Sequence, residues 1–147
     1  MSAYTTIVVG TDGSESSLKA VERAGALAGD AASLVIACAY FPNDKSAGGA
    51  ADVLKDEAYQ VTGSTPTEEI LRSAKERATK AGAANIDQRS IKGAPVDALL
   101  QLVTDTKADL LVVGNKGLNS IAGRLLGSVP ADVARKSACD VLIVHTT

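Results

Sequence analysis

Glycines at fixed spacing, together with a serine, give this chain its clearest chemical feature. The segment Gly114-Asn115-Lys116-Gly117 is followed, after nine further residues, by Gly127-Ser128. Glycine lets backbone N–H groups approach an anion without a side chain in the way, and a helix beginning at Ser128 would add unpaired N–H donors and a favourable dipole. The pattern predicts a cradle for phosphate groups, and it indicates nucleotide binding more clearly than any reaction.

A second polar segment, Gly10-Thr11-Asp12, directly follows the first apolar run of the chain. In an open α/β sheet, ligands bind outside the carboxyl ends of the strands, where the strand order reverses. If the strands that precede Asp12 and Gly114 are neighbours, both loops face one crevice and Asp12 stands across it from the glycine loop. Two interpretations of Asp12 stay open, because it is either a ligand contact or an acid that favours the start of a helix through the dipole.

The charge available to a phosphate chain is small. Lys116 and Arg124 fall within the glycine-bounded loop, where either one would meet phosphate charge or lie solvated on the surface. Pro130 removes one N–H from the first turn of the helix that begins at Ser128. Strong dependence on a long phosphate chain is therefore not expected, and a monophosphate or cyclic phosphate stays open.

Several enzyme motifs are missing from the sequence. It contains no Gly-x-x-x-x-Gly-Lys-Ser/Thr, no Gly-x-Gly-x-x-Gly after the first apolar run, and no Gly-x-Ser-x-Gly. His145 is the only histidine and has no partner at catalytic spacing. These observations argue against a P-loop NTPase, a dinucleotide-dependent dehydrogenase and a serine hydrolase. Cys38 and Cys139 show no metal-binding spacing, so we expect reduced, buried thiols.

Strands and helices alternate along the chain. Continuous apolar runs at residues 6–9, 34–37, 110–113 and 141–144 predict strands covered on both faces, and the alternating segment 86–91 predicts a strand nearer an edge. Helix starts are predicted at Ser14, at Thr65 through a capping box with Pro66 in the first turn, at Pro95 and at Ser128. The second of these helices should end at Gly82. Residues 41–64 form a long irregular stretch, either mobile or a lid, in which residues 50–61 offer a short helix.

This alternation predicts an α/β fold with a mostly parallel sheet and helices on both faces, built as one domain over residues 1–147. The formal net charge of −2 and a pI near 5.3 argue against nucleic acid as a partner. No stretch has the length of a membrane span, and the first residues lack a signal-peptide pattern. We therefore expect a cytoplasmic protein that binds no membrane.

Essentially the whole sequence resembles the universal stress protein family, in particular its small, single-domain, ATP-binding branch. The signature of that branch is Gly-x2-Gly-x9-Gly followed by Ser, Thr or Asn, here Gly114, Gly117, Gly127 and Ser128. Asp12 after the first strand and a closing Val-Leu-Ile-Val strand also match. The resemblance implies a Rossmann-like three-layer sandwich, of the adenine nucleotide α-hydrolase type, with five parallel strands in the order 3-2-1-4-5. It also implies an adenine nucleotide in the crevice.

Carried over by position, the resemblance assigns a role to each part of the crevice. Gly114 and Gly117, with Asn115 and Lys116 between them, should lie against ribose and phosphates, and the phosphate oxygens should be held by Gly127, Ser128 and Val129. Asp12 should face ribose or adenine, or help hold a metal ion. The backbone of Ala39 should meet the adenine edge, with Gly10 and Thr11 as the floor.

We therefore predict a regulatory or nucleotide-sequestering protein that binds ATP, AMP or cyclic AMP, with Mg²⁺ accompanying ATP, and that is not an enzyme. Two alternatives stay open: a slow metal-dependent ATP hydrolase that uses Asp12, and a mainly structural interaction protein. The last strand, which begins at Val141 and ends at His145, is apolar and would form an unpaired sheet edge. Together with the family's usual dimer, this edge predicts a homodimer.

Overall fold

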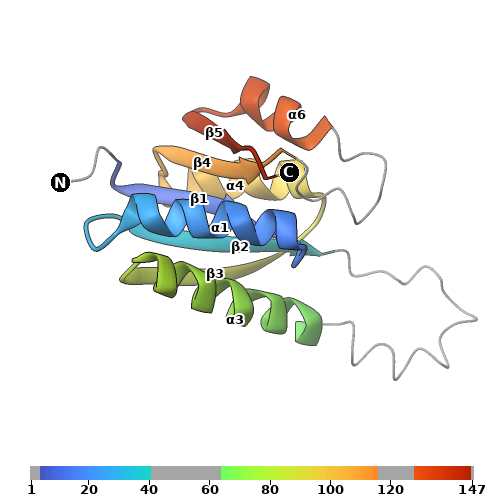
Figure 1. Cartoon of the computed structure of the whole chain (residues 1–147). Coiled ribbons are helices and arrows are strands. Elements are labelled where there is room, and N and C mark those ends of the chain that lie inside the picture. Colours follow the sequence, from blue (N-terminus) through green and yellow to red (C-terminus); the bar gives the residue numbers. More distant parts are fainter. Residues whose placement is uncertain (1–3, 41–63, 116–127, 147) are drawn as a thin grey trace, which may run out of the picture.

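The computed structural model describes residues 4–40, 64–115 and 128–146 (Figure 1). Strands and helices alternate along the whole of this part of the chain, as the sequence predicts. The elements are β1 (Thr6–Gly10), α1 (Glu15–Ala28), β2 (Ser33–Tyr40), α3 (Ser64–Ala81), β3 (Asn85–Lys92), α4 (Pro95–Thr106), β4 (Leu110–Gly114), α6 (Ser128–Lys136) and β5 (Asp140–Val144).

All five strands are parallel and form one sheet in the order β3-β2-β1-β4-β5, which confirms the expected fold class. β1 lies at the centre, with Val8 opposite both Val35 of β2 and Leu111 of β4. The chain therefore leaves β1 toward one side of the sheet and later returns on the other side at β4. The reversal of strand order falls between β1 and β4, so the loops that follow these two strands leave the same edge of the sheet.

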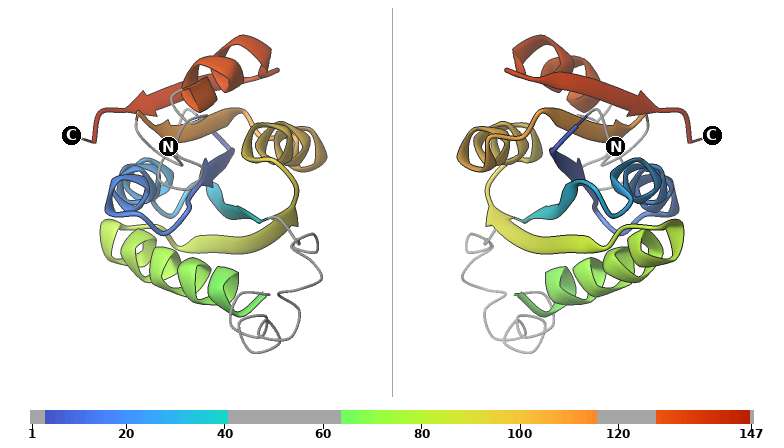
Figure 2. Two further views of the ribbon diagram at one scale, coloured as in Figure 1. Left: turned by 90° about the vertical axis from the view of Figure 1, so that its right-hand side faces the viewer. Right: turned by 90° about the vertical axis from the view of Figure 1, so that its left-hand side faces the viewer.

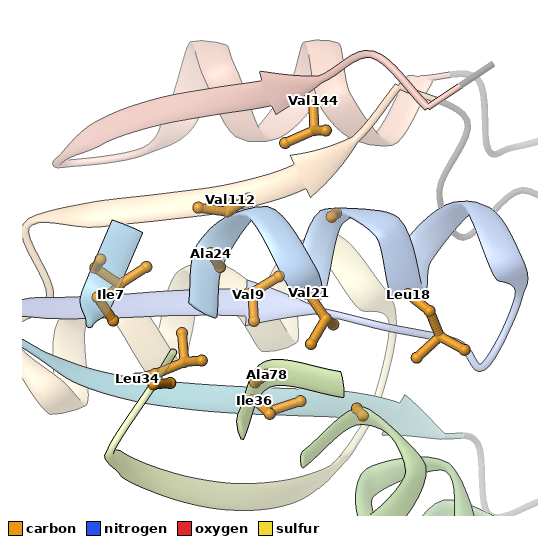
Figure 3. Packing of buried hydrophobic residues seen from close by; sticks show 14 of the residues in the cluster. Ile7, Val9, Leu18, Val21, Ala24, Leu34, Ile36, Ala78, Val112 and Val144 are labelled. Carbon is orange, nitrogen blue, oxygen red and sulfur yellow. The ribbon is translucent and has the colours of Figure 1, made fainter. Parts of the chain in front are cut away.

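Helices cover both faces of the sheet, as Figure 2 shows, with α1 and α3 on one face and α4 on the other. Alternate residues of β1 serve the two faces: Ile7 and Val9 belong to the core under α1 and α3, and Val8 belongs to the core under α4. Figure 3 shows the first of these cores from close by, with Val9 near Val21 of α1. Continuous burial on both faces explains why the central strands are apolar without alternation.

The contact between α1 and α3 requires a glycine. A Cβ atom on Gly25 would lie 2.8 Å from the carbonyl oxygen of Ala78, which is closer than side chains approach backbone. The small residues at this crossing, including Ala24 and Ala74, are fully buried. Gly25 therefore lets two helices pack at close range on one face of the sheet.

Three of the four predicted helix starts are confirmed. Ser14 caps α1, whereas α4 begins at Pro95 and α6 begins at Ser128. The Ser14 side chain accepts a hydrogen bond from the N–H of Ser17 at 3.1 Å. The prediction that Thr65 caps α3 is wrong by two residues, since a cap at Thr65 would make Pro66 the first helical residue and the helix begins at Ser64. Pro66 permits this earlier start because the first-turn N–H groups have no intrahelical partners.

β3 is an edge strand with alternating half-buried and exposed residues, as predicted, and α3 ends before Gly82. The predicted short helix at residues 50–61, and nearly all of the long stretch 41–64, lie outside the described residues. Both cysteines are free; Cys38 is buried, but Cys139 is only half-buried because it precedes the edge strand β5. Within the described part of the chain, no helix is both long and apolar enough to cross a membrane.

Candidate functional site

The turn after β1 is held by hydrogen bonds from its own side chains. Thr11 is 1% exposed, its N–H donates to the carbonyl of Ala37 at 2.9 Å, and its hydroxyl lies 2.7 Å from that of Ser17. The same hydroxyl accepts from the N–H of Gly13 at 3.0 Å. Thr11 therefore contributes to the crevice as a fixed wall, and its buried hydroxyl is already committed to the turn.

Asp12 lies half-buried at the rim of this turn. Its Oδ1 accepts from the N–H of Ser14 at 2.9 Å, and its own N–H donates to the Ser17 hydroxyl at 3.2 Å. The carboxylate thus orders the residue that caps α1, in line with the helix-start interpretation. Its charge also reaches the end of β2: burial, and secondly the Asp12 carboxylate, raise the pKa of Cys38 to about 11. Asp12 therefore has a structural role in this turn, and its charge acts on the end of β2.

A small apolar pocket opens beside this turn, between the carboxyl ends of β1 and β2 and the start of α4. It encloses about 220 Å³, including space open to solvent. A Cβ on Gly10 would lie 3.1 Å from Cδ1 of Leu99, so glycine lets α4 pack closely against the end of β1. The lining residues are Gly10, Thr11, Ala37, Ala39, Ile91, Pro95, Ala98 and Leu99. Most of this lining is apolar, as is common in ligand pockets.

Only three of the eight residues that line this pocket were predicted from the sequence. Gly10, Thr11 and Ala39 are among the predicted residues, whereas the walls from β3 and α4 (Ile91, Pro95, Ala98 and Leu99) are not. The proline that opens α4 was the available signal, because it marks a helix start at the carboxyl edge of the sheet.

On the other side of β1, the glycine loop starts from a fixed position. Gly114 is buried and pairs with Val144 of β5, and the N–H of Asn115 donates to the carbonyl of Val144 at 2.9 Å. The Asn115 side-chain oxygen accepts two further hydrogen bonds, from the N–H and the hydroxyl of Thr146, both at 2.9 Å. The first two residues of the loop are thus tied to the segment that follows β5.

The structure brings six predicted residues to one edge of the sheet: Gly10, Thr11, Asp12, Ala39, Gly114 and Asn115. Ser128 and Val129 open α6, which starts on this side because it runs back from β4 to the parallel strand β5. Lys116, Gly117, Arg124 and Gly127 lie outside the described residues. His145 is exposed beyond β5.

A five-stranded parallel sheet with strand order 3-2-1-4-5, and with an apolar pocket and a glycine-bearing loop at its carboxyl edge, defines the class of open α/β proteins that take ligands where the strand order reverses. The chain belongs to the universal stress protein family, since the model of that family matches residues 3–145.

Relatives agree with this assignment along the full length. Universal stress protein Rv1636 of Mycobacterium tuberculosis is 64% identical over 147 residues, which cover all of both chains. The crystal structure of a universal stress protein in complex with cAMP is 56% identical, with a TM-score of 0.77 over 99% of this chain and 100% of that one. The fold also resembles that of a universal stress protein from Archaeoglobus fulgidus in complex with dAMP, at 18% identity and a TM-score of 0.64 over 95% and 97% of the two chains.

Proposed function

We propose that residues 1–147 act as one domain that binds an adenine nucleotide (ATP, AMP or cyclic AMP) and works in the cytoplasm as a regulatory or nucleotide-sequestering protein. The observation that carries this proposal is the apolar pocket at the carboxyl ends of β1 and β2, which lies on the same sheet edge as the start of the glycine loop. The related structure in complex with cAMP supports the adenine ring as its occupant.

The base would enter between the two short side chains of Ala39 and Ala98, with Gly10 as the floor. Alanine and glycine walls leave room for a ring and give it apolar contact on its faces. The backbone of Ala39, near the end of β2, is in the right place to offer hydrogen-bonding groups to the ring edge. In this arrangement Asp12 would face the ribose.

The phosphate would lie between β4 and the start of α6. Gly114, Asn115, Lys116 and Gly117 leave β4, and Gly127, Ser128 and Val129 lead into α6. Backbone N–H groups in the first turn of a helix, with its dipole, suit an anion. Pro130 lies within that turn and removes one donor, which favours ligands that carry a single phosphate, among them cyclic AMP.

Thermal unfolding in the presence of ATP, ADP, AMP and cyclic AMP tests this proposal. A ligand at a hundredfold excess over its Kd should stabilise the protein by about 2.7 kcal/mol. Ala39→Leu should abolish the stabilisation by filling the pocket, whereas Ala26→Leu, on the exposed side of α1, should leave it intact. If none of the four nucleotides raises the melting temperature, the binding function is wrong and a mainly structural interaction protein is the better account.

A slow ATP hydrolase is the second candidate, because the Asp12 charge lies at the rim of the crevice. Among the described residues no group of three or more His, Cys, Asp or Glu side chains could hold a metal ion, so Mg²⁺ would be shared between ATP and Asp12. Asp12→Asn keeps an acceptor for the N–H of Ser14 and removes the charge. Steady phosphate release that this variant loses would favour hydrolysis, and no release from the unaltered protein would leave binding alone.

We also propose a homodimer through β5, from Val141 to His145. Ile143 is 42% exposed on this edge strand, and Leu27 of α1 is 41% exposed. A shallow apolar groove runs along the same edge, lined by Tyr4, Leu27, Leu110, Asp140, Val141 and Leu142. Pairing with a second copy would cover both the free backbone groups and these apolar side chains.

A further inference from the structure

Thr146 lies where three distant parts of the chain meet. The residue follows β5 and is 7% exposed. Its hydroxyl donates to Oδ1 of Asn115 at 2.9 Å, its N–H donates to the same atom at 2.9 Å, and its hydroxyl lies 2.5 Å from that of Ser16. Asn115 belongs to the loop after β4, and Ser16 to the first turn of α1.

The donor and acceptor atoms of Ser16, Thr146 and Asn115 fix the direction of each hydrogen bond between them. Oδ1 of Asn115 is an acceptor only, so the hydroxyl of Thr146 must donate its single proton to that oxygen. The Ser16 hydroxyl must then donate to the Thr146 oxygen. The opposite orientation of the Asn115 amide would set its NH₂ group against the N–H of Thr146, two donors facing each other. The chain Ser16, Thr146, Asn115 therefore has one favourable arrangement.

These hydrogen bonds join the elements on either side of the strand reversal, on the α1 face of the sheet. Ser16 comes four residues after Asp12 and two after the cap Ser14, so it moves with the turn that follows β1. Asn115 is the second residue of the glycine loop on the other side of the strand reversal. Figure 2 shows the C-terminal end of the chain on the α1 side of the sheet. The contact with the Ser16 hydroxyl places Thr146 beside the first turn of α1.

We propose that Thr146 is a positioning residue, which holds the start of the glycine loop at a fixed separation from the Asp12 turn. This inference rests on the proposed nucleotide binding. Thr146 does not touch the nucleotide; it fixes Asn115, from which the rest of the loop continues, and it fixes the turn that carries Asp12. The Asp12 turn and the start of the glycine loop then have a fixed relative position before a ligand binds. The protein therefore loses less conformational freedom on binding.

Nucleotide titration by calorimetry on Thr146 variants tests the role. Thr146→Val keeps the shape and the N–H bond to Asn115, removes the hydroxyl and leaves Ser16 without its acceptor. The loss of these two part-buried hydrogen bonds should weaken the affinity for cyclic AMP by about 3- to 10-fold. Thr146→Ser should restore it. Thr104→Val removes an exposed hydroxyl that bonds only to Leu100 within α4, and should bind as the unaltered protein does.

A double-mutant comparison separates positioning from general destabilisation. Ser16→Ala breaks the same chain of hydrogen bonds, so Ser16→Ala with Thr146→Val should bind no more weakly than Thr146→Val alone. Losses that add, or a Thr146→Val variant whose melting temperature falls while its Kd is unchanged, would overturn the positioning role. If the unaltered protein binds none of the nucleotides, the proposed function itself fails, which is a different result from equal binding by both forms.

Discussion

At the residue scale, the crevice is ordered by short side chains that bond to the backbone before any ligand is present. Within the turn after β1, hydrogen bonds are made by the side-chain oxygens of Thr11, Asp12, Ser14 and Ser17. After β4, the side-chain oxygen of Asn115 accepts a hydrogen bond from the N–H of Thr146. Backbone N–H groups near such turns are held in place, which is what a phosphate or ribose site requires. Thr11, Asp12, Ser14 and Asn115 were singled out from the sequence, but Ser17 was not. The distant partners of Thr11 and Asn115, Ala37 and Thr146, become neighbours only in the folded chain.

The Cys38 thiol should react slowly with alkylating reagents. It is buried, and its pKa is raised to about 11 by burial and by the nearby Asp12 carboxylate, so little thiolate forms near neutral pH. Iodoacetamide should therefore modify the half-buried Cys139 first and reach Cys38 only after unfolding in denaturant. Peptide mass spectrometry at timed intervals measures the two rates. Equal rates in the native protein would contradict the packing of β2 described here.

Asp109 should stabilise the protein in a pH-dependent way. Its carboxylate accepts from the N–H groups of Thr5 and Thr6 at 3.0 Å each. Burial acts to raise the pKa of Asp109, but these hydrogen bonds outweigh it and lower the pKa. A lowered folded-state pKa gives stability that is complete above the unfolded value of about 3.9 and is lost as the pH falls through the folded value.

Asp109→Asn should consequently reduce the unfolding free energy by about 1 kcal/mol at pH 7. Urea unfolding should show that difference unchanged down to about pH 5 and closing below about pH 4. Asp30→Asn, at an exposed position, is the control. A difference in unfolding free energy that grows as the pH falls would contradict a lowered pKa of Asp109.

At the element scale, strands and helices were predictable because their signals are local. Ser14, Pro95 and Gly82 marked helix ends correctly, and the apolar runs located the strands, although β2 extends to Tyr40, beyond its run at residues 34–37. The helix cap predicted at Thr65 was wrong by two residues, because several residues in a first turn can serve as its start. The pocket walls from α4 were missed because they depend on how that helix crosses the sheet, which no local pattern encodes.

Gly25→Ala tests the close crossing of α1 and α3. In an unobstructed helix this change would stabilise by roughly 1 kcal/mol. Here the new methyl group meets the carbonyl of Ala78, so we expect a loss of about 1–3 kcal/mol in unfolding free energy. Ala26→Ser, at an exposed position of the same helix, should change stability by less than about 0.5 kcal/mol. A more stable Gly25→Ala protein would show that the helices lie further apart.

At the scale of the whole molecule, the two edges of the sheet differ in character. β3 ends the sheet with charged and polar residues, whereas β5 ends it with exposed Ile143 beside an apolar groove. Charged edges discourage pairing, and apolar edges invite it. The strand order was available only through the family resemblance, because the runs themselves do not state which strands are neighbours.

Ile143→Lys should convert the proposed dimer into a monomer without unfolding it. The buried charge would disfavour the paired edge, and the isolated edge would gain solubility. Light scattering after size exclusion, at micromolar concentration, measures the mass of each form. Ser90→Lys, on the opposite edge strand, should leave the mass unchanged. A monomeric unaltered protein at this concentration would contradict the dimer.

The central claim, that an adenine nucleotide binds where the strand order reverses, is tested most directly by following backbone amide resonances during titration with cyclic AMP. The account predicts saturable changes at the carboxyl ends of the strands, including Gly10, Ala39 and Asn115, and none at the amino ends, such as Asn85 and Asp140. Changes confined to the amino ends of the strands, or no saturable change at any amide, would contradict it.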